Sequence, residues 1–342
     1  MGAKDYRKAI SWFEKAKAKQ PQNALVRFYK GGCYSSMERF DASIRELQEA
    51  LKMRPSGKLR AQIYETMGYV YDNQKNYAQA IVVYREIGKQ SKVAEMDLDC
   101  MEVEFTYGVR MDLETAKDVD ALAKEKGIIL SVHAPYYINL ASDETEKFTA
   151  SKERILASCE RANAMGARNV TFHAGFYQKR THEKTYQSIK KALMDLKKNI
   201  SQKRWQVTLC PEVTGKPSQF GSLEELLRLK EETGCGITVD FSHLYARHRG
   251  DVDYGRILNK LPKKFHAHFS GIEYGDKGER KHIRTTEQFF APLAKELVRR
   301  DLDITIINES PSPYEDAAMM KEVLQRLQKK LAEKDSTYKT QS

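Results

Sequence analysis

Histidines and carboxylates stand at the ends of most predicted strands in the C-terminal two thirds of the chain. Six strand-like segments end at His133, His173, Glu212, Asp240, His268 and Glu309. In a parallel β/α arrangement the carboxyl ends of the strands meet on one face, where active sites form. Imidazole and carboxylate ligands together suit Zn²⁺, Mn²⁺ or Fe²⁺. One such histidine is more often a hydrogen-bonded core residue, but six equivalent positions predict a metal site.

Two further histidines extend this set. His243 follows Asp240 by three residues and is expected just above the same strand, and His282 is expected in the loop after the strand that ends at His268. The other three histidines, His182, His248 and His266, show no such placement. We interpret them as surface or strand residues.

Short apolar segments that alternate with helical stretches after Val93 must position these side chains. The predicted strands are 100–105, 128–133, 169–173, 206–212, 236–240, 265–269 and 303–309. The predicted helices are 113–126, 152–166, 185–201, 222–233, 253–259, 286–300 and 314–334. Repeated strand–helix units predict parallel strands joined by crossovers. Their number favours an α/β TIM-type barrel over a doubly wound sheet, and a G-x-G-x-x-G motif that would indicate a dinucleotide site is absent.

The first 95 residues carry an internal repeat. Ala9, Phe13, Ala16 and Pro21 recur 34 residues later as Ser43, Leu47, Ala50 and Pro55, and a partial third copy contains Ala80, Tyr84 and Ile87. Small residues let helices approach closely, and proline ends a helix. This pattern of about two and a half copies resembles tetratricopeptide (TPR) repeats, an all-α helical-repeat domain. The resemblance implies a protein or peptide partner on the repeat surface; packing of the helices on the next domain is an equally open interpretation.

The composition of the chain narrows the classes of protein to which it can belong. The chain has 342 residues and a formal net charge of +11, which is compatible with a polyanionic partner. Residues 1–97 hold 18 Lys and Arg against 11 Asp and Glu, so most of the excess lies on the repeats, and an argument for DNA must rest on the site. Five cysteines without a C-x-x-C pair argue against a zinc finger or a disulfide framework. With no signal peptide and no membrane-spanning apolar run, we expect a cytoplasmic protein without membrane contact.

Several motifs after residue 100 resemble those of the endonuclease IV (AP endonuclease family 2) barrels. They run in family order and are closest in wording to archaeal members. The matching segments are SVHAPYYINLAS (131–142), FHAG (172–175), PEVTG (211–215), DFSHL (240–244), HAHFSG (266–271) and NESP (308–311).

The resemblance implies a zinc centre. His133 and His173 would hold the first metal, and Glu212 would bridge it to the second, which Asp240, His268 and Glu309 complete; His243 and His282 would hold a third. Glu212 and Glu309 are also the implied catalytic residues. Zn²⁺ is the expected cofactor, and Mn²⁺ is a second candidate.

The implied activity is that of a deoxyribonuclease IV, an apurinic/apyrimidinic endonuclease of base excision repair. The reaction is hydrolysis of the phosphodiester 5′ to an abasic site in DNA. Tyr136 and Tyr137 match the family's inserting loop, and Arg110 matches an arginine that probes the lesion. Loop packing is the alternative role for the two tyrosines.

Two departures from the family pattern qualify this expectation. Arg280 stands where the third metal normally has an aspartate, so two zinc sites are expected and the third is in question. Glu279, one residue earlier, is a possible substitute with a different geometry. The barrel also lacks its first strand, which would leave edges on its first and last strands. We divide the chain into repeats (1–95), barrel (96–334) and a disordered tail (335–342). Two alternatives remain open: a catalytically impaired barrel whose TPR repeats act as an interaction module, and a sugar isomerase or epimerase of the same barrel superfamily.

Overall fold

The computed structural model describes residues 3–73, 92–300 and 302–339 and divides into two compact units. The first comprises residues 1–91 and 110–122, and the second comprises residues 92–109 and 123–342. The expected boundary at residue 95 therefore falls at residue 91. Residues 110–122, assigned above to the barrel, group with the repeats instead, because Leu122 is buried in the core of the repeat unit.

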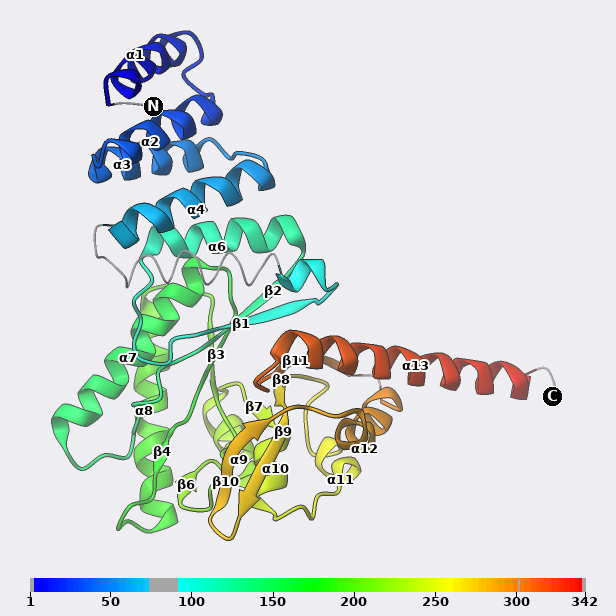
Figure 1. Ribbon diagram of the computed structural model, residues 1–342. Helices are drawn as coiled ribbons and strands as arrows, with labels where there is room; N and C mark the ends of the chain where they lie inside the picture. Colours follow the sequence, from blue (N-terminus) through cyan, green and yellow to red (C-terminus); the bar gives the residue numbers. More distant parts are fainter. Residues whose placement is uncertain (1–2, 74–91, 301, 340–342) are drawn as a thin grey trace. The chain divides into compact units, whose positions relative to one another are not determined.

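The first unit is entirely helical in its described part. Its elements are α1 (Ala3–Lys19), α2 (Ala24–Ser36), α3 (Phe40–Lys52), α4 (Gly57–Asn73) and most of α6 (Leu113–Lys126). Consecutive helices α1 to α4 pack on one another (Figure 1). Leu47, Ile63 and Val70 are fully buried in a core that also includes Leu122. The partial third copy at Ala80, Tyr84 and Ile87 lies outside the described residues.

Two adjacent glycines of α2 provide a test of this helix packing. A Cβ atom at Gly31 would lie 2.8 Å from Leu47 Cγ, whereas a Cβ at Gly32 would meet nothing within 4 Å. Gly31→Ala is expected to lower the free energy of unfolding of the repeat unit by about 1–3 kcal/mol through overpacking. Gly32→Ala should instead stabilise the helix by about 0.5–1 kcal/mol. Urea unfolding followed by circular dichroism measures both, and equal effects of the two variants would contradict the packing.

The second unit is built on seven parallel strands. They are β1 (Cys100–Glu104), β2 (Ile129–His133), β3 (Asn169–Phe172), β5 (Thr208–Pro211), β7 (Thr238–Asp240), β8 (Lys264–Phe269) and β11 (Asp303–Asn308). Hydrogen-bonded ladders join β1-β2-β3-β5 and β7-β8-β11, and one parallel bridge between Glu212 and Thr238 links these two arcs. All seven predicted strands are therefore present, with ends shifted by at most two residues.

The expected absence of a first strand leaves a seam between β1 and β11. Within the described residues no backbone ladder joins these two strands. They are nevertheless neighbours, because the Cys100 thiol donates to the Ile306 carbonyl oxygen at an S···O distance of 3.7 Å. The described part of the barrel is thus a seven-stranded arc whose two edges meet without pairing.

Helices follow the strands as the alternation predicts. They are α7 (Thr145–Ala164), α8 (His182–Gln202), α9 (Leu223–Thr233), α10 (Phe241–Arg247), α11 (Tyr254–Leu258), α12 (Glu287–Val298) and α13 (Pro313–Lys339). Local sequence sets their ends: Ser222 and Glu225 form a capping box at the start of α9, and Gly234 ends it at φ 63°. No helix of the described ranges combines the length and the apolar content that crossing a bilayer requires.

Two features differ from the expectation. The described helix α13 runs to Lys339, so residues 335–339 are helical where a disordered tail was expected; a helix satisfies its own backbone hydrogen bonds and can extend beyond its packed turns. Four short strands were also not anticipated. They form the antiparallel pairs β4 (Gly175–Phe176) with β6 (Gln219–Phe220), and β9 (Gly271–Gly275) with β10 (Gly278–Ile283).

Candidate metal centre

Side chains from the carboxyl ends of the strands and the segments after them lie in three groups, two of which share Glu212. The groups are His133, His173 and Glu212; Glu212, Asp240, His268 and Glu309; and His243, Glu279 and His282. Within each group the nearest nitrogen and oxygen atoms lie within 4.8 Å of one another. All eight residues predicted as metal ligands are thus brought together, and Glu279 joins them.

Glu212 lies at the centre and faces two sets of histidines. Its Oε2 is 3.0 Å from Nε2 of both His133 and His173, while its Oε1 is 3.2 Å from Nδ1 of His268. The side chain is only 1% exposed. A carboxylate whose two oxygens point to different histidine sets has the arrangement of a bridging ligand.

The second group places two more carboxylates beside His268. Glu309 Oε1 lies 3.1 Å from His268 Nδ1. Asp240 ends β7 and caps α10, because its Oδ1 accepts a hydrogen bond from the backbone N–H of His243 at 2.7 Å. Its other oxygen, Oδ2, is buried without a directed hydrogen bond among the described residues. This oxygen lies 3.1 Å from His243 Nδ1, so the cap leaves it on the side of the cluster, without a directed hydrogen bond in the described part of the chain.

A β-bulge decides which residue completes the third group. The β9–β10 ladder pairs Glu279 with Tyr274 and Lys281 with Glu273, so Arg280 is the extra residue. The bulge brings Glu279 and His282 to the same side although they are three residues apart. Glu279 Oε2 lies 3.4 Å from His243 Nε2, and Glu279 Oε1 lies 3.8 Å from His282 Nε2.

Two expectations are corrected here. Arg280 is exposed and packs against Gly275, so it does not occupy a ligand position. His282 lies on strand β10 of a hairpin, not in a loop. Close approach of β10 to the segment after β5 requires glycine at Gly215, where a Cβ would be 2.6 Å from Glu279 Cβ. The third group therefore depends on the close contact between β10 and the segment after β5.

Three of the histidines use one ring nitrogen for a neutral partner. Nδ1 of His133 donates to the Ala134 carbonyl oxygen at 2.8 Å, and Nδ1 of His243 donates to that of Val213 at 2.9 Å. Nδ1 of His282 lies 2.7 Å from Ser270 Oγ. In each case Nε2 is directed toward a carboxylate of the cluster. Such outer partners fix the ring orientation and the tautomer of metal-binding histidines.

The buried charges shift one another's pKa values strongly. Burial opposes ionisation of Glu212, but His173 and His268 outweigh it and hold the pKa of Glu212 well below its usual range. Burial likewise opposes the charged form of Glu309, and His268 lowers the pKa of Glu309 to about 2. Both carboxylates are therefore ionised at neutral pH. Burial raises the pKa of Asp240.

The pH dependence of metal binding follows from His133. Burial would lower the pKa of His133, yet its hydrogen bond to Glu212 raises the pKa to about 9 in the metal-free protein. The protonated ring stabilises the metal-free fold below about pH 6.5, and this contribution is lost as the pH rises through 9. A cation must displace this proton. We expect zinc affinity, measured in metal buffers at pH 6.5, 7.5 and 8.5, to rise with pH; a constant affinity would contradict the assignment.

The residues present fit a divalent metal centre. The donor set combines imidazole nitrogens with carboxylates, as Zn²⁺ and Mn²⁺ sites do. Asp240 Oδ2 is a buried oxygen that lacks a directed partner among the described residues. The buried base of the cluster is formed by Glu212, Asp240 and His268, each at most 1% exposed. Such a set of charges is compatible with one or more cations.

The predicted DNA-contacting residues are exposed. Tyr136 and Tyr137 follow β2 and are 57% and 65% exposed. The ring centroid of Tyr136 lies 6.2 Å from that of His133 and 6.3 Å from that of His173, so this tyrosine borders the cluster. Arg110 is exposed and belongs to the helical unit.

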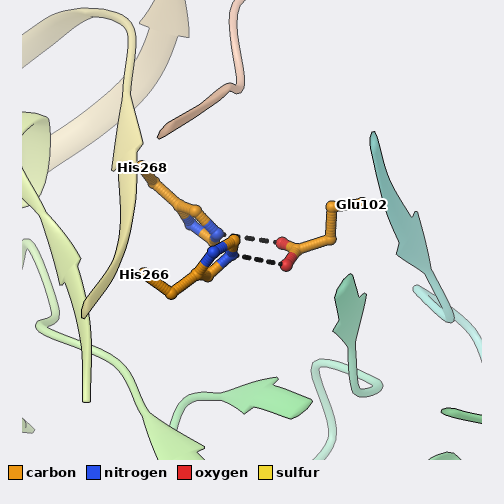
Figure 2. A group of neighbouring side chains, drawn as sticks. All are labelled: Glu102, His266 and His268. Atoms are coloured by element: carbon orange, nitrogen blue, oxygen red, sulfur yellow. Dashed lines mark hydrogen bonds and ion pairs between the residues drawn. The ribbon is translucent and has the colours of Figure 1, made fainter. Parts of the chain in front are cut away.

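Sequence reasoning missed a buried group below the cluster. Glu102 of β1 contacts His266 and His268 of β8 (Figure 2). His266 had been interpreted as a surface or strand residue; it is a strand residue that is 2% exposed. The available signals were a carboxylate inside an apolar strand and two histidines at the two-residue spacing that shares one strand face.

The fold agrees with the comparisons to known proteins. Residues 91–330 match the xylose isomerase-like TIM barrel family, and the chain belongs to that family. Residues 61–87 match a tetratricopeptide repeat, which supports the helical-repeat interpretation of the N-terminal part.

Two proteins similar in sequence match the barrel part of this chain. An uncharacterized protein of Methanocaldococcus jannaschii is 39% identical over 240 residues, which are 66% of this chain and 87% of the relative. A protein of Metamycoplasma arthritidis named "Probable endonuclease 4" is 27% identical over 60% of this chain and 82% of its own length.

Two crystal structures share the fold. One is a D-tagatose 3-epimerase-like protein (TM-score 0.58, 20% identity, 71% of this chain and 93% of the other). The other is endonuclease IV from Thermus thermophilus (TM-score 0.55, 18% identity, 71% and 94%). These two similarities show the fold that this chain shares with both structures.

Proposed function

We propose that this protein is a metal-dependent endonuclease that hydrolyses the DNA phosphodiester 5′ to abasic sites. The observation that carries the proposal is the three-group cluster of imidazole and carboxylate side chains centred on Glu212. Relatives named as endonuclease 4 and the motifs at His133, His173 and Asp240 support it. Zn²⁺ is the proposed cofactor, and Mn²⁺ is a second candidate.

Divalent cations held by these residues would neutralise the phosphate and supply the Lewis acidity that the reaction requires. A water oxygen adds to phosphorus, and the bond from phosphorus to the 3′ oxygen breaks to leave a 3′-hydroxyl and a 5′-deoxyribose phosphate. Glu309 is ionised at neutral pH and its side chain is 16% exposed, so its carboxylate can accept a hydrogen bond from the attacking water and orient it. Solvent then takes the proton that this water loses and supplies the proton of the 3′-hydroxyl.

Recognition of the lesion is assigned to the rim of the site. An abasic nucleotide must leave the stack, and an aromatic side chain can fill the gap. Tyr136 and Tyr137 are exposed aromatic residues beside the cluster. We propose that they stack against the bases that flank the lesion. We also propose that Arg110 contacts the lesion and that the TPR repeats bind a protein or peptide.

The direct test uses a duplex with one tetrahydrofuran abasic analogue and the zinc- or manganese-loaded protein. We expect a single nick 5′ to the analogue, no nick in the intact duplex, and no activity after chelation. Folded, metal-loaded protein that leaves the duplex uncut would overturn the nuclease proposal. Epimerisation of a ketose sugar by the same sample would favour the sugar epimerase alternative.

Tyrosine variants separate lesion recognition from chemistry. Base–aromatic stacking contributes about 1–3 kcal/mol per base, so Tyr136→Ala or Tyr137→Ala should weaken binding of abasic DNA about 5–150-fold. Zinc content should not change. Tyr69→Ala is the matched control, because Tyr69 is similarly exposed, at 56%, but lies on the helical unit. Fluorescence anisotropy measures the affinities, and unaltered binding in both tyrosine variants would assign these residues to loop packing.

A further inference from the structure

Glu102 connects two histidines inside the barrel. Its Oε2 accepts a hydrogen bond from His266 Nε2 at 2.9 Å, and its Oε1 lies 2.9 Å from His268 Nε2 (Figure 2). The three side chains are at most 1% exposed. His266 and His268 are two residues apart on β8, so both rings face the barrel interior.

His268 is oriented differently from the other candidate ligands with an outer partner. Its Nδ1 faces the metal cluster, 3.2 Å from Glu212 Oε1 and 3.1 Å from Glu309 Oε1. Its Nε2 faces a carboxylate rather than a neutral group. His133 has the reverse arrangement, with Nδ1 on a backbone carbonyl and Nε2 toward the cluster.

The contact between Glu102 and His268 joins two buried polar atoms. Glu102 Oε1 and His268 Nε2 are buried 2.9 Å apart, and neither atom has a directed hydrogen bond within the described structure. A buried carboxylate oxygen and a buried ring nitrogen are both costly to leave unpaired. His266 Nδ1 also lacks a partner in the described residues, and His266 Nε2 donates to Glu102 Oε2.

We propose that Glu102 is a positioning residue of the metal centre. It accepts a hydrogen bond from the protonated Nε2 of His268, so that Nδ1 keeps its lone pair for a cation, and its charge makes the ring a stronger ligand. His266 holds the other carboxylate oxygen and so fixes Glu102. This role rests on the proposed metal centre, and it does not depend on which substrate that centre acts on.

The same contact crosses the seam of the barrel. β11 pairs with β8 and contacts β1 through Cys100 and Ile306, so β11 lies between β1 and β8. The side chain of Glu102 on β1 therefore extends past β11 to reach β8. β1 has a ladder on one side only in the described structure, to β2. The position of this edge strand is therefore coupled to the orientation of His268. Metal binding should slow hydrogen exchange of the backbone amides of β1.

The test measures zinc affinity by competition with a chromophoric chelator at fixed pH. Glu102→Gln keeps the shape but loses the charge, and should bind zinc about 10–100-fold more weakly. Metal-dependent protection of β1 in hydrogen exchange should also disappear. His266→Gln retains an N–H donor for Glu102 and should bind within about threefold of wild type, whereas His266→Ala should approach the Glu102→Gln value.

Three outcomes would overturn the proposal. The first is wild-type zinc affinity in Glu102→Gln, including the case in which only the melting temperature of the metal-free protein falls, which is the result of a purely structural pair. The second is a His268 ring without a proton on Nε2 in ¹⁵N NMR of the zinc-loaded wild type, a measurement that needs no variant to fold. The third is a wild-type protein that binds no zinc. Zinc binding without DNA incision overturns the proposed nuclease activity alone.

Discussion

Glu212→Gln is expected to lower DNA incision by about 10³-fold or more, because metal ions contribute several kcal/mol to such a reaction and about 4 kcal/mol corresponds to this factor. The amide removes the negative charge that faces His133, His173 and His268 in a buried site. We expect the purified variant to contain less zinc than wild type. Plasma emission spectrometry for metal content and the abasic-duplex assay measure the two effects.

The matched control for this variant is Glu225→Gln. Glu225 accepts hydrogen bonds from Tyr177 and Ser222 in the α9 cap and is not part of the metal cluster. Its replacement should lower stability and leave zinc content and incision intact. If Glu212→Gln kept its zinc and cut within tenfold of wild type, Glu212 could not be the bridging ligand.

Glu279→Gln is expected to remove one bound metal per chain and to lower incision about 10²-fold, the effect of losing about 2.7 kcal/mol of transition-state stabilisation. The reason is the bulge at Arg280, which turns Glu279 toward His243 and His282. Zinc stoichiometry from equilibrium dialysis distinguishes this result from a general loss of folding.

Arg280→Gln provides the matched control one residue away. Arg280 is exposed and packs against Gly275 instead of the cluster, so its replacement should leave the zinc stoichiometry unchanged. If Arg280→Gln lowered the zinc stoichiometry and Glu279→Gln left it unchanged, then Arg280 would not be the bulged residue. The two variants together decide whether the departure from the family pattern at residue 280 impairs the third site.

Much of the barrel was predictable because its strand signals are local. Apolar segments such as those ending at His133, Asp240 and His268 alternate with helical stretches, and every one of these segments forms a strand. The repeat period in the first 95 residues similarly predicted helices that pack around Leu47. The assignment of residues 110–122 to the helical unit was missed, because helix periodicity does not say which core a helix packs against.

The hairpin and the inner contacts could not be predicted in the same way. Strands β9 and β10 lie in a segment that carries charged residues, so they lack the apolar pattern of the barrel strands. Each of them is held by backbone hydrogen bonds to the other. Whether Glu279 or Arg280 faces His243 depends on one bulged residue, since a shift of one residue turns a side chain to the other face. The contact of Glu102 with His266 joins residues that are 164 positions apart.

The sequence by itself determined the barrel class, the repeat class and the set of strand-end side chains, because strand and helix periodicities and strand polarity are properties of short segments. Tertiary structure decided which ring nitrogen each histidine presents, that the sequence candidate Glu279 and not Arg280 faces His243, and that Glu102 contacts His268 across the seam. These depend on hydrogen bonds between segments far apart in the chain, and only the folded barrel brings such segments together.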